Sequence, residues 1–223
     1  MSAHDPEDLR RIYGARFQAN LAYRDQVWQV LTAEFFQQFI GASDRVLDLG
    51  CGYGEFTRNI RCGAKWAMDL NPEAPRYLGE GITFLEQDCA ARWPLADGTL
   101  DAVFTSNFFE HLPDKAALGR TLNEVRRCLA PGGRLIAMGP NIKFLPGSYW
   151  DFWDHYLPLT EKSLAEALTT RGFKIARSED RFLPYTMAGG PQYPLIFLRA
   201  YLRLRPAWKI LGRQFLVVAT KPS

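Results

Sequence analysis

Two spacings of hydrophobic residues alternate along this chain of 223 residues. Short apolar runs, typical of buried strands, separate stretches in which apolar residues recur at helical spacing. Seven runs are predicted to be strands: Arg45–Leu49, Lys65–Leu70, Ile82–Glu86, Leu100–Ser106, Arg134–Met138, Phe173–Ala176 and Phe215–Thr220. Strands that alternate with helices in this way favour an α/β fold, with a mostly parallel sheet covered by helices on both faces.

The predicted helices have recognisable start and stop signals. Residues 7–40 have apolar side chains at helical spacing and precede a glycine. A long helix over about Asp114–Leu129 ends at a Pro-Gly-Gly sequence, and a helix over Thr160–Arg171 begins at a threonine suited to capping. We therefore divide the chain into an N-terminal helical cap, residues 1–41, and a main domain, residues 42–223.

The composition is that of an ordinary soluble globular protein, with 47% hydrophobic and 23% charged residues. No apolar stretch approaches the length of a membrane span, and residues 1–8 form no signal-peptide pattern, so we expect a cytoplasmic protein. The four cysteines have no C-x-x-C spacing, which favours reduced thiols over disulfides or a zinc site.

The net charge of +3 is unevenly distributed. Residues 183–223 contain six basic residues and no acid, whereas the rest of the chain is not basic enough to suggest a nucleic-acid-binding protein. Within this tail, an inserted segment at about 183–213 is basic and amphipathic, and Leu195–Leu204 is predicted to be a helix. Residues 194–213 would either form a lid on the sheet edge or touch a membrane surface or a lipid-linked phosphate acceptor.

The strongest chemical signal follows the first predicted strand. There, Val46-Leu47-Asp48-Leu49 leads directly into Gly50-Cys51-Gly52-Tyr53-Gly54. Three alternating glycines let a ligand lie against the backbone. A second acid, Asp69, ends the next strand nineteen residues beyond Gly50, at a spacing suited to gripping the two hydroxyls of a ribose.

This loop resembles motif I of the class I S-adenosylmethionine (SAM)-dependent methyltransferases, and Asp69 resembles their ribose-binding acid. A dinucleotide-binding loop instead reads G-x-G-x-x-G, and its third glycine lets a helix N-terminus approach a pyrophosphate. Here Glu55 stands at that position, where its carboxylate would repel a diphosphate. Asp48 can face the cationic amino-acid end of SAM. We therefore favour a SAM site over a nicotinamide site.

The resemblance covers about residues 45–180. It includes P-L-x-D-G-x-L-D-x-V, which ends at Val103, and E-V-x-R-x-L-x-P-G-G, which ends at Gly133. It implies a Rossmann-like class I methyltransferase fold with seven strands, in which the last strand runs antiparallel between the fifth and the sixth. It also implies an enzyme with SAM as its cofactor.

The family's cofactor pocket can be carried over residue by residue, because ligands bind at the carboxyl ends of parallel strands. Asp69 should hold the ribose, and Asp88 should accept the adenine amino group unless it only caps a helix. The backbone at Asn107 should hold the methionine portion, whose carboxylate Tyr13 and Arg16 could bind if they are not ordinary helix surface. The full set of expected cofactor residues is Asp48, Gly50, Gly52, Gly54, Asp69, Leu70, Asp88, Cys89, Asn107, Tyr13 and Arg16.

The segment from Phe144 to Tyr156 contains six aromatic and three titratable residues. In this fold it commonly walls the acceptor site, and its rings suit a planar or sugar ring. His155, oriented by Asp151 or Asp154, is the first candidate for a base that deprotonates an acceptor hydroxyl, unless it caps a helix or bonds internally. His111 is another candidate base, although in the family this histidine is often a packed core residue.

Metal-dependent catechol-type members place additional acids around the fourth strand, whereas Ser106-Asn107 offers no such cluster, so we predict no metal. We expect a methyltransferase that acts on a small-molecule or glycan-type acceptor, with a hydroxyl oxygen as nucleophile. The tail loosely resembles methyltransferases of polysaccharide and glycolipid biosynthesis. The alternatives are a SAM-binding regulatory protein without catalysis and a nicotinamide-dependent oxidoreductase.

Overall fold

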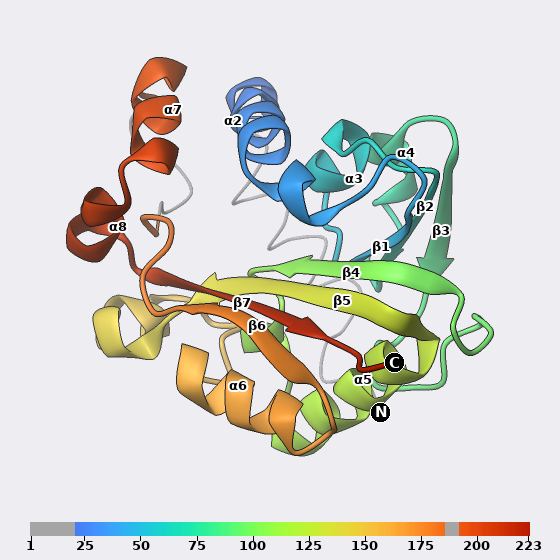
Figure 1. Cartoon of the computed structure of the whole chain (residues 1–223). Coiled ribbons are helices and arrows are strands. Elements are labelled where there is room, and N and C mark those ends of the chain that lie inside the picture. Colours follow the sequence, from blue (N-terminus) through green and yellow to red (C-terminus); the bar gives the residue numbers. More distant parts are fainter. Residues whose placement is uncertain (1–20, 186–191) are drawn as a thin grey trace.

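A seven-stranded sheet forms the centre of the protein, as the computed structural model shows for residues 21–185 and 192–223. The strands lie in the order β3-β2-β1-β4-β5-β7-β6 (Figure 1). Their bounds are β1 (Arg45–Leu49), β2 (Ala64–Asp69), β3 (Ile82–Glu86), β4 (Leu100–Ser106), β5 (Leu129–Pro140), β6 (Lys174–Glu179) and β7 (Gln214–Thr220). Strand β7 is antiparallel to both β5 and β6, which confirms the predicted fold class and the place of the last strand.

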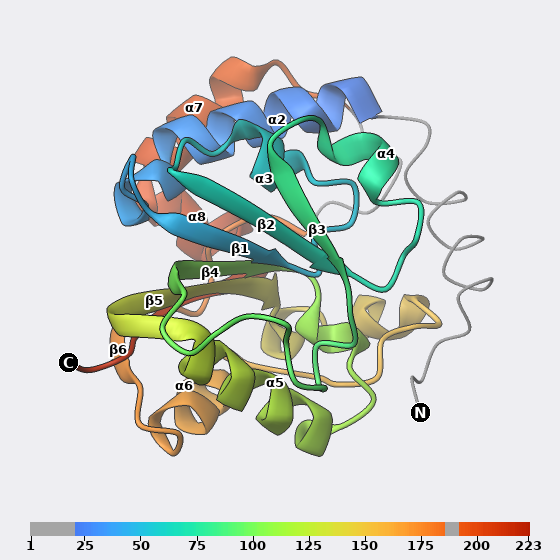
Figure 2. The same cartoon turned by 90° about the vertical axis from the view of Figure 1, so that its right-hand side faces the viewer.

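Helices cover both faces of this sheet (Figures 1 and 2). One face carries α5 (Lys115–Cys128) and α6 (Glu161–Thr169), and the other carries α2 (Leu21–Glu34), α3 (Glu55–Asn59), α7 (Leu195–Arg203) and α8 (Arg205–Leu211). Neighbouring strand residues point to opposite faces. Leu47 and Leu49 therefore join the hydrophobic cluster of α5 and α6, whereas Val46 joins the cluster of α2.

The first described helix ends earlier than the hydrophobic pattern suggests. Helix α2 stops at Glu34, and a 3₁₀ turn, η2 (Phe36–Phe39), follows it. At Phe35 the backbone leaves the helical conformation (φ −132°), and both Phe35 and Phe36 are buried in the cluster that covers the sheet. Successive residues of a regular helix point about 100° apart, so this break lets both rings enter one cluster. The division at residue 41 stays a prediction, since α2 shares its core with the sheet.

Side-chain caps fix the ends of the two long helices on the other face. The Asp114 carboxylate accepts a hydrogen bond from the Ala117 amide, so α5 begins where the sequence predicts. Thr160 and Ser163 form a reciprocal capping box at the start of α6. The short turns η3 (Phe109–His111), η4 (Ile142–Phe144) and η5 (Ser148–Asp151) precede these helices, and α4 (Pro75–Leu78) lies beside α3 (Figure 2).

The inserted segment between β6 and β7 forms α7 and α8. Leu195, Leu198 and Leu202 pack into the same cluster as α2, which is the arrangement expected of a lid. Arg199 and Arg203 form ion pairs with Glu34 of α2, at 2.6 and 3.4 Å. On the other side of the segment, Ile196, Phe197, Leu204, Ile210 and Leu211 are all more than half exposed. Among the described helices, none combines the length and the apolar character that crossing a bilayer requires.

Candidate active site

The glycine loop after β1 has a backbone that only glycine adopts easily. Gly50, Gly52 and Gly54 have φ values of 71°, 54° and 71°. A Cβ atom on Gly50 would lie 2.2 Å from the Phe108 ring, and one on Gly54 would lie 2.3 Å from a Leu78 methyl group. Both positions therefore require glycine for conformation and for space.

Asp69 lies across this loop with its carboxylate fixed by two backbone amides. The Gly52 amide donates to Oδ2 at 2.8 Å, and the Asn71 amide donates to Oδ1 at 2.9 Å. Burial raises the pKa of Asp69, while these two amides oppose that rise. Each carboxylate oxygen can accept more than one hydrogen bond. The geometry therefore fits a group that presents two neighbouring hydroxyls, as a ribose does.

Two further acids lie beneath the loop. Asp48 is buried and accepts a hydrogen bond from the Thr57 hydroxyl at 2.5 Å. Burial raises the pKa of Asp48 to about 7, and the negative charges of Glu55 and Asp69 add to the rise. A cationic ligand would offset that cost, as expected for the amino-acid end of SAM. Glu55 forms an ion pair with Arg24 of α2 at 2.8 Å, so its charge is largely neutralised.

At the end of β3, Asp88 accepts a hydrogen bond from the Ala90 amide at 2.8 Å. This is a local turn and not a helix cap, because no helix lies between β3 and β4, and it fixes the carboxylate just beyond the strand end. The Cys89 thiol packs in the core 3.4 Å from the Thr121 hydroxyl, and burial raises its pKa to about 12. Cys89 could therefore contact a ligand only through its backbone. Leu70 is half-buried after β2, and Tyr13 and Arg16 lie outside the described residues.

Asn107 has the one positive φ of a non-glycine residue in the described part of the chain, 49°. Its amide donates to the Met138 carbonyl at 2.9 Å, which ties the end of β4 to β5. Such a backbone is strained and persists where the surrounding structure imposes it, often at functional sites. The sharp turn also directs the chain into η3, so that Phe108 lies over Gly50.

Directly after this turn, the structure brings two histidines together. The His111 and His155 rings are 5.1 Å apart between centroids. His111 Nδ1 lies 2.8 Å from the Asp154 carbonyl oxygen and 3.2 Å from the Asp154 carboxylate. His155 Nδ1 lies 2.9 Å from the Tyr149 carbonyl oxygen. Because all these neighbours are acceptors, Nδ1 carries a proton in both rings.

This pairing differs from the predicted one, in which Asp151 or Asp154 orients His155. The Asp154 carboxylate contacts His111, and a backbone carbonyl holds His155, because Asp154 lies in the turn that follows η5 and its carboxylate is directed to η3. Asp151 is exposed. Burial alone lowers the pKa of His111, but contact with Asp154 raises this pKa overall.

A third member of the cluster, Glu110, was not singled out from the sequence. Its side chain is only 3% exposed, and burial raises its pKa to about 7. Each of Glu110, His111 and His155 offers one atom that can bind a metal ion, and these three atoms lie within 4.8 Å of one another. The sequence signal that could identify Glu110 is an acid beside His111 among the apolar residues Phe108, Phe109 and Leu112.

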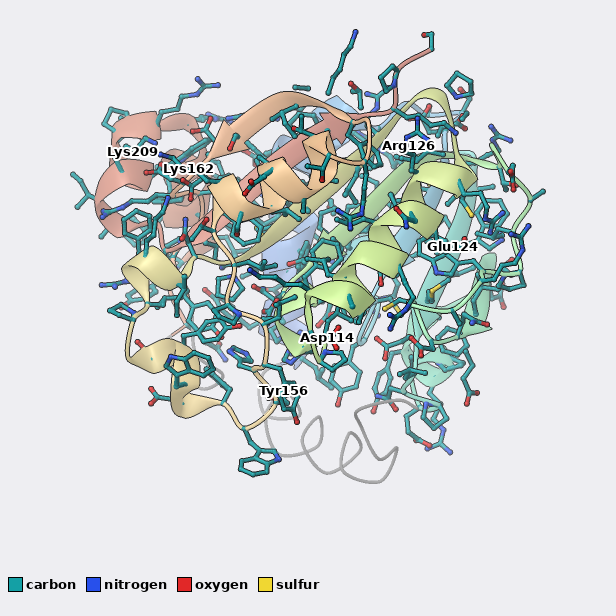
Figure 3. All side chains as sticks on the ribbon, turned by 90° about the horizontal axis from the view of Figure 1, so that it is seen from below. Asp114, Glu124, Arg126, Tyr156, Lys162 and Lys209 are labelled. Atoms are coloured by element: carbon teal, nitrogen blue, oxygen red, sulfur yellow. The ribbon has the colours of Figure 1, made fainter. Side chains whose placement is uncertain are left out.

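The cluster borders the proposed cofactor edge and the aromatic segment. His111 is near enough to Asp69 to lower the pKa of that carboxyl group. Of the aromatic segment, Tyr149 is fully buried beside His155, whereas Trp150 and Trp153 are 56% and 83% exposed. Figure 3 shows Tyr156 near the start of α5, which Asp114 marks, and the Tyr156 amide donates to the Glu110 carbonyl.

The sheet order, the glycine loop and the acid after β2 together define a Rossmann-like cofactor-binding domain. Residues 47–137 match the model of a methyltransferase domain family. Over these residues the chain is similar to methyltransferase domains, and solved SAM-dependent methyltransferases share its fold. Because Arg24 neutralises Glu55, the charge argument against a nicotinamide cofactor is weaker than expected. The match to a methyltransferase domain favours SAM over that cofactor instead.

Three known proteins illustrate the relationship. A demethylmenaquinone methyltransferase of Symbiobacterium thermophilum is 27% identical over 163 residues, which are 63% of this chain and 61% of that protein. A chloroplastic tocopherol O-methyltransferase of Arabidopsis thaliana is 32% identical over 130 residues, which are 48% of this chain and 36% of that protein. The chain thus spans less than two thirds of either relative.

The third is a solved structure. It is the N-methyltransferase NodS of Bradyrhizobium japonicum in complex with S-adenosyl-L-homocysteine (SAH). The match has a TM-score of 0.61 and covers 93% of this chain and 91% of the NodS chain. It is 15% identical to this chain, so it shares the fold.

Proposed function

We propose that the protein transfers a methyl group from SAM to a hydroxyl oxygen of a small-molecule or glycan-type acceptor. The observation that carries this proposal is the cluster of Glu110, His111 and His155, which borders the cofactor edge and the aromatic segment. A hydroxyl needs help in losing its proton, and this cluster can supply that help. The tocopherol relative, whose name specifies O-methylation, agrees with oxygen as the nucleophile.

In this proposal the cofactor residues act as an alignment device. SAM supplies an electrophilic methyl group on a sulfonium. The glycine loop allows close approach to the backbone, Asp69 grips the ribose hydroxyls, and Asp48 faces the cationic amino-acid end. Asp88, Leu70 and the Cys89 backbone surround the adenine, and the backbone at Asn107 supports the methionine portion. Alignment of the two reactants supplies much of the rate in such a displacement.

The exposed rings beside the cluster suit the acceptor. Trp150, Trp153 and Tyr156 are each at least 40% exposed, and they could stack on a planar or sugar ring. A SAM-binding regulatory protein without catalysis would need no buried polar cluster between cofactor and acceptor. Burying such groups costs free energy, so their presence favours catalysis.

The first test is cofactor identity. SAH at saturating concentration should raise the melting temperature, because a ligand that binds only the native state stabilises it by about 2.7 kcal/mol at 100 times its Kd. For a domain of this size that corresponds to about 5–10 °C. NAD and NADP serve as controls and should give no comparable shift. A larger shift with NAD would overturn the proposed cofactor site. An acceptor screen with tritiated SAM then tests catalysis.

We also propose that the outer side of α7 and α8 makes peripheral contact with an anionic membrane surface or a lipid-linked acceptor. Ile196, Phe197 and Ile210 are 62%, 63% and 74% exposed. Arg203 and Lys209 are 80% and 59% exposed near them. Apolar and basic side chains on one short helical element are typical of interfacial binding. Glu34 and Asp180 partly neutralise these basic residues by ion pairs.

Flotation with vesicles tests this contact. Binding should be stronger to anionic than to neutral vesicles and should fall as salt is raised. Replacing Ile196 and Phe197 with serine should weaken it several-fold, whereas Glu34→Gln should strengthen it, because it removes the carboxylate that Arg199 and Arg203 share.

Lys162 provides a matched control for the charge effect (both lysines are labelled in Figure 3). Lys209 lies on α8 and Lys162 on α6, and Figure 1 shows α6 on the other face of the sheet. Lys209→Gln should reduce flotation and Lys162→Gln should not. Equal, weak flotation of the wild-type protein with both vesicle types would leave the segment as a packed lid.

A further inference from the structure

The cluster of Glu110, His111 and His155 has the composition of a cation site. Two imidazole nitrogens and one carboxylate oxygen lie within 4.8 Å of one another. Ligands about 2.1 Å from a single ion lie about 3–3.5 Å apart. The ligand atoms therefore need to approach one another by at most about 1.3–1.8 Å to hold an ion. The lack of an acid cluster around the fourth strand predicts no metal, but these ligands come from η3 and from a loop that follows η5.

Both histidines are oriented as metal ligands usually are. A ligating imidazole typically donates its other ring N–H to a carboxylate or a backbone carbonyl, which fixes the tautomer. His111 donates from Nδ1 to Asp154, and His155 donates from Nδ1 to the Tyr149 carbonyl. Nε2 is therefore the nitrogen of each ring that would bind an ion. Two independent partners, Asp154 and Tyr149, place a proton on the same nitrogen of the two rings.

The surroundings of Glu110 also favour a cation. Its carboxylate is buried, and among residues 21–185 and 192–223 no lysine or arginine forms an ion pair with it. Nearby, the Tyr149 hydroxyl is buried and has no hydrogen-bond partner in the described part of the chain. Buried carboxylates are normally paired or bound to a metal. His111 is 25% exposed, so an ion can reach the cluster.

We propose that Glu110, His111 and His155 bind one divalent first-row transition-metal ion, such as zinc or iron(II). Two imidazoles and one carboxylate suit these ions better than magnesium or calcium, which prefer oxygen ligands. Three protein ligands leave at least one coordination position open. The role of this site rests on the proposed function: the bound ion activates the acceptor. A hydroxyl oxygen at the open position loses its proton to water more easily, as metal-bound water does, and His155 then acts as a ligand instead of a base.

Direct metal binding tests this proposal without an acceptor. Tag-free, full-length protein is freed of metal with a chelator and then dialysed against zinc or cobalt(II), and bound metal is measured by mass spectrometry. We expect about one ion per chain. Cobalt(II) should also give visible absorption bands that depend on the imidazole ligands. Glu110→Gln and His155→Gln should each weaken binding at least about tenfold.

A matched control is Glu161→Gln. Glu161 is also buried, at 6% exposure, but it contacts Lys143 and Asn141 and lies outside the cluster. This variant should bind metal like the wild type. SAH-induced stabilisation reports whether each variant is folded. One folded variant of the two, Glu110→Gln or His155→Gln, is sufficient for the test. No ion above background in the wild type, or unchanged affinity in both ligand variants, would overturn the site. Metal binding without SAH binding would instead contradict the proposed function.

Discussion

Asp69→Ala should weaken the binding of SAH at least tenfold, measured by calorimetry. Both oxygens of this carboxylate are already aimed by the Gly52 and Asn71 amides. Hydrogen bonds from ribose hydroxyls to an ionised group contribute about 1.5–3 kcal/mol each, so the loss of two is a large effect. Asp69→Asn keeps one acceptor oxygen and should show an intermediate loss.

The control for Asp69 is Glu86→Ala. Glu86 is the register partner of Asp69 on β3 and also ends a strand, but its side chain is exposed and has no assigned role. Its replacement should leave SAH affinity unchanged. Melting temperatures without ligand show whether the loop has been disturbed, because Asp69 also holds Gly52. Unchanged affinity in folded Asp69→Ala protein would refute the ribose-binding role.

Gly50→Ala should lower the melting temperature by about 5–15 °C and reduce SAH binding. An alanine Cβ would lie 2.2 Å from the Phe108 ring, at a φ of 71°. The backbone strain costs about 1–3 kcal/mol and the displacement of Phe108 a similar amount. About 2–4 °C per kcal/mol is expected for a domain of this size.

Gly81→Ala separates these two causes. Gly81 has a φ of 74°, but a Cβ there would meet no atom within 4 Å. It should therefore show the conformational cost alone, about 1–2 kcal/mol, and should keep its affinity for SAH. If both variants lose the same stability, the contact between Gly50 and Phe108 does not matter for the loop.

Local patterns in the sequence were sufficient for the strands and for several helix ends. The apolar runs at β1 and β4 match their observed bounds, because a buried strand needs a continuous apolar stretch, and the bounds of the edge strand β3 also match. Asp114 and Thr160 cap the helices that follow them, because a cap depends on residues only three positions away. The helix before β1 was overestimated, since tertiary packing of Phe35 and Phe36 ended it early.

Within the candidate site, the sequence by itself determined the glycine loop and the strand-end acid Asp69, because both depend on short-range spacing after a strand. The antiparallel last strand came from family resemblance, and the structure confirmed it. Only the tertiary structure decided that Arg24 neutralises Glu55, that Asp154 contacts His111, and that Glu110 joins the two histidines. Arg24 and Glu55 are 31 residues apart along the chain, His111 and Asp154 are 43 apart, and Glu110 and His155 are 45 apart. The path of the backbone, and not any local pattern, therefore brings them together.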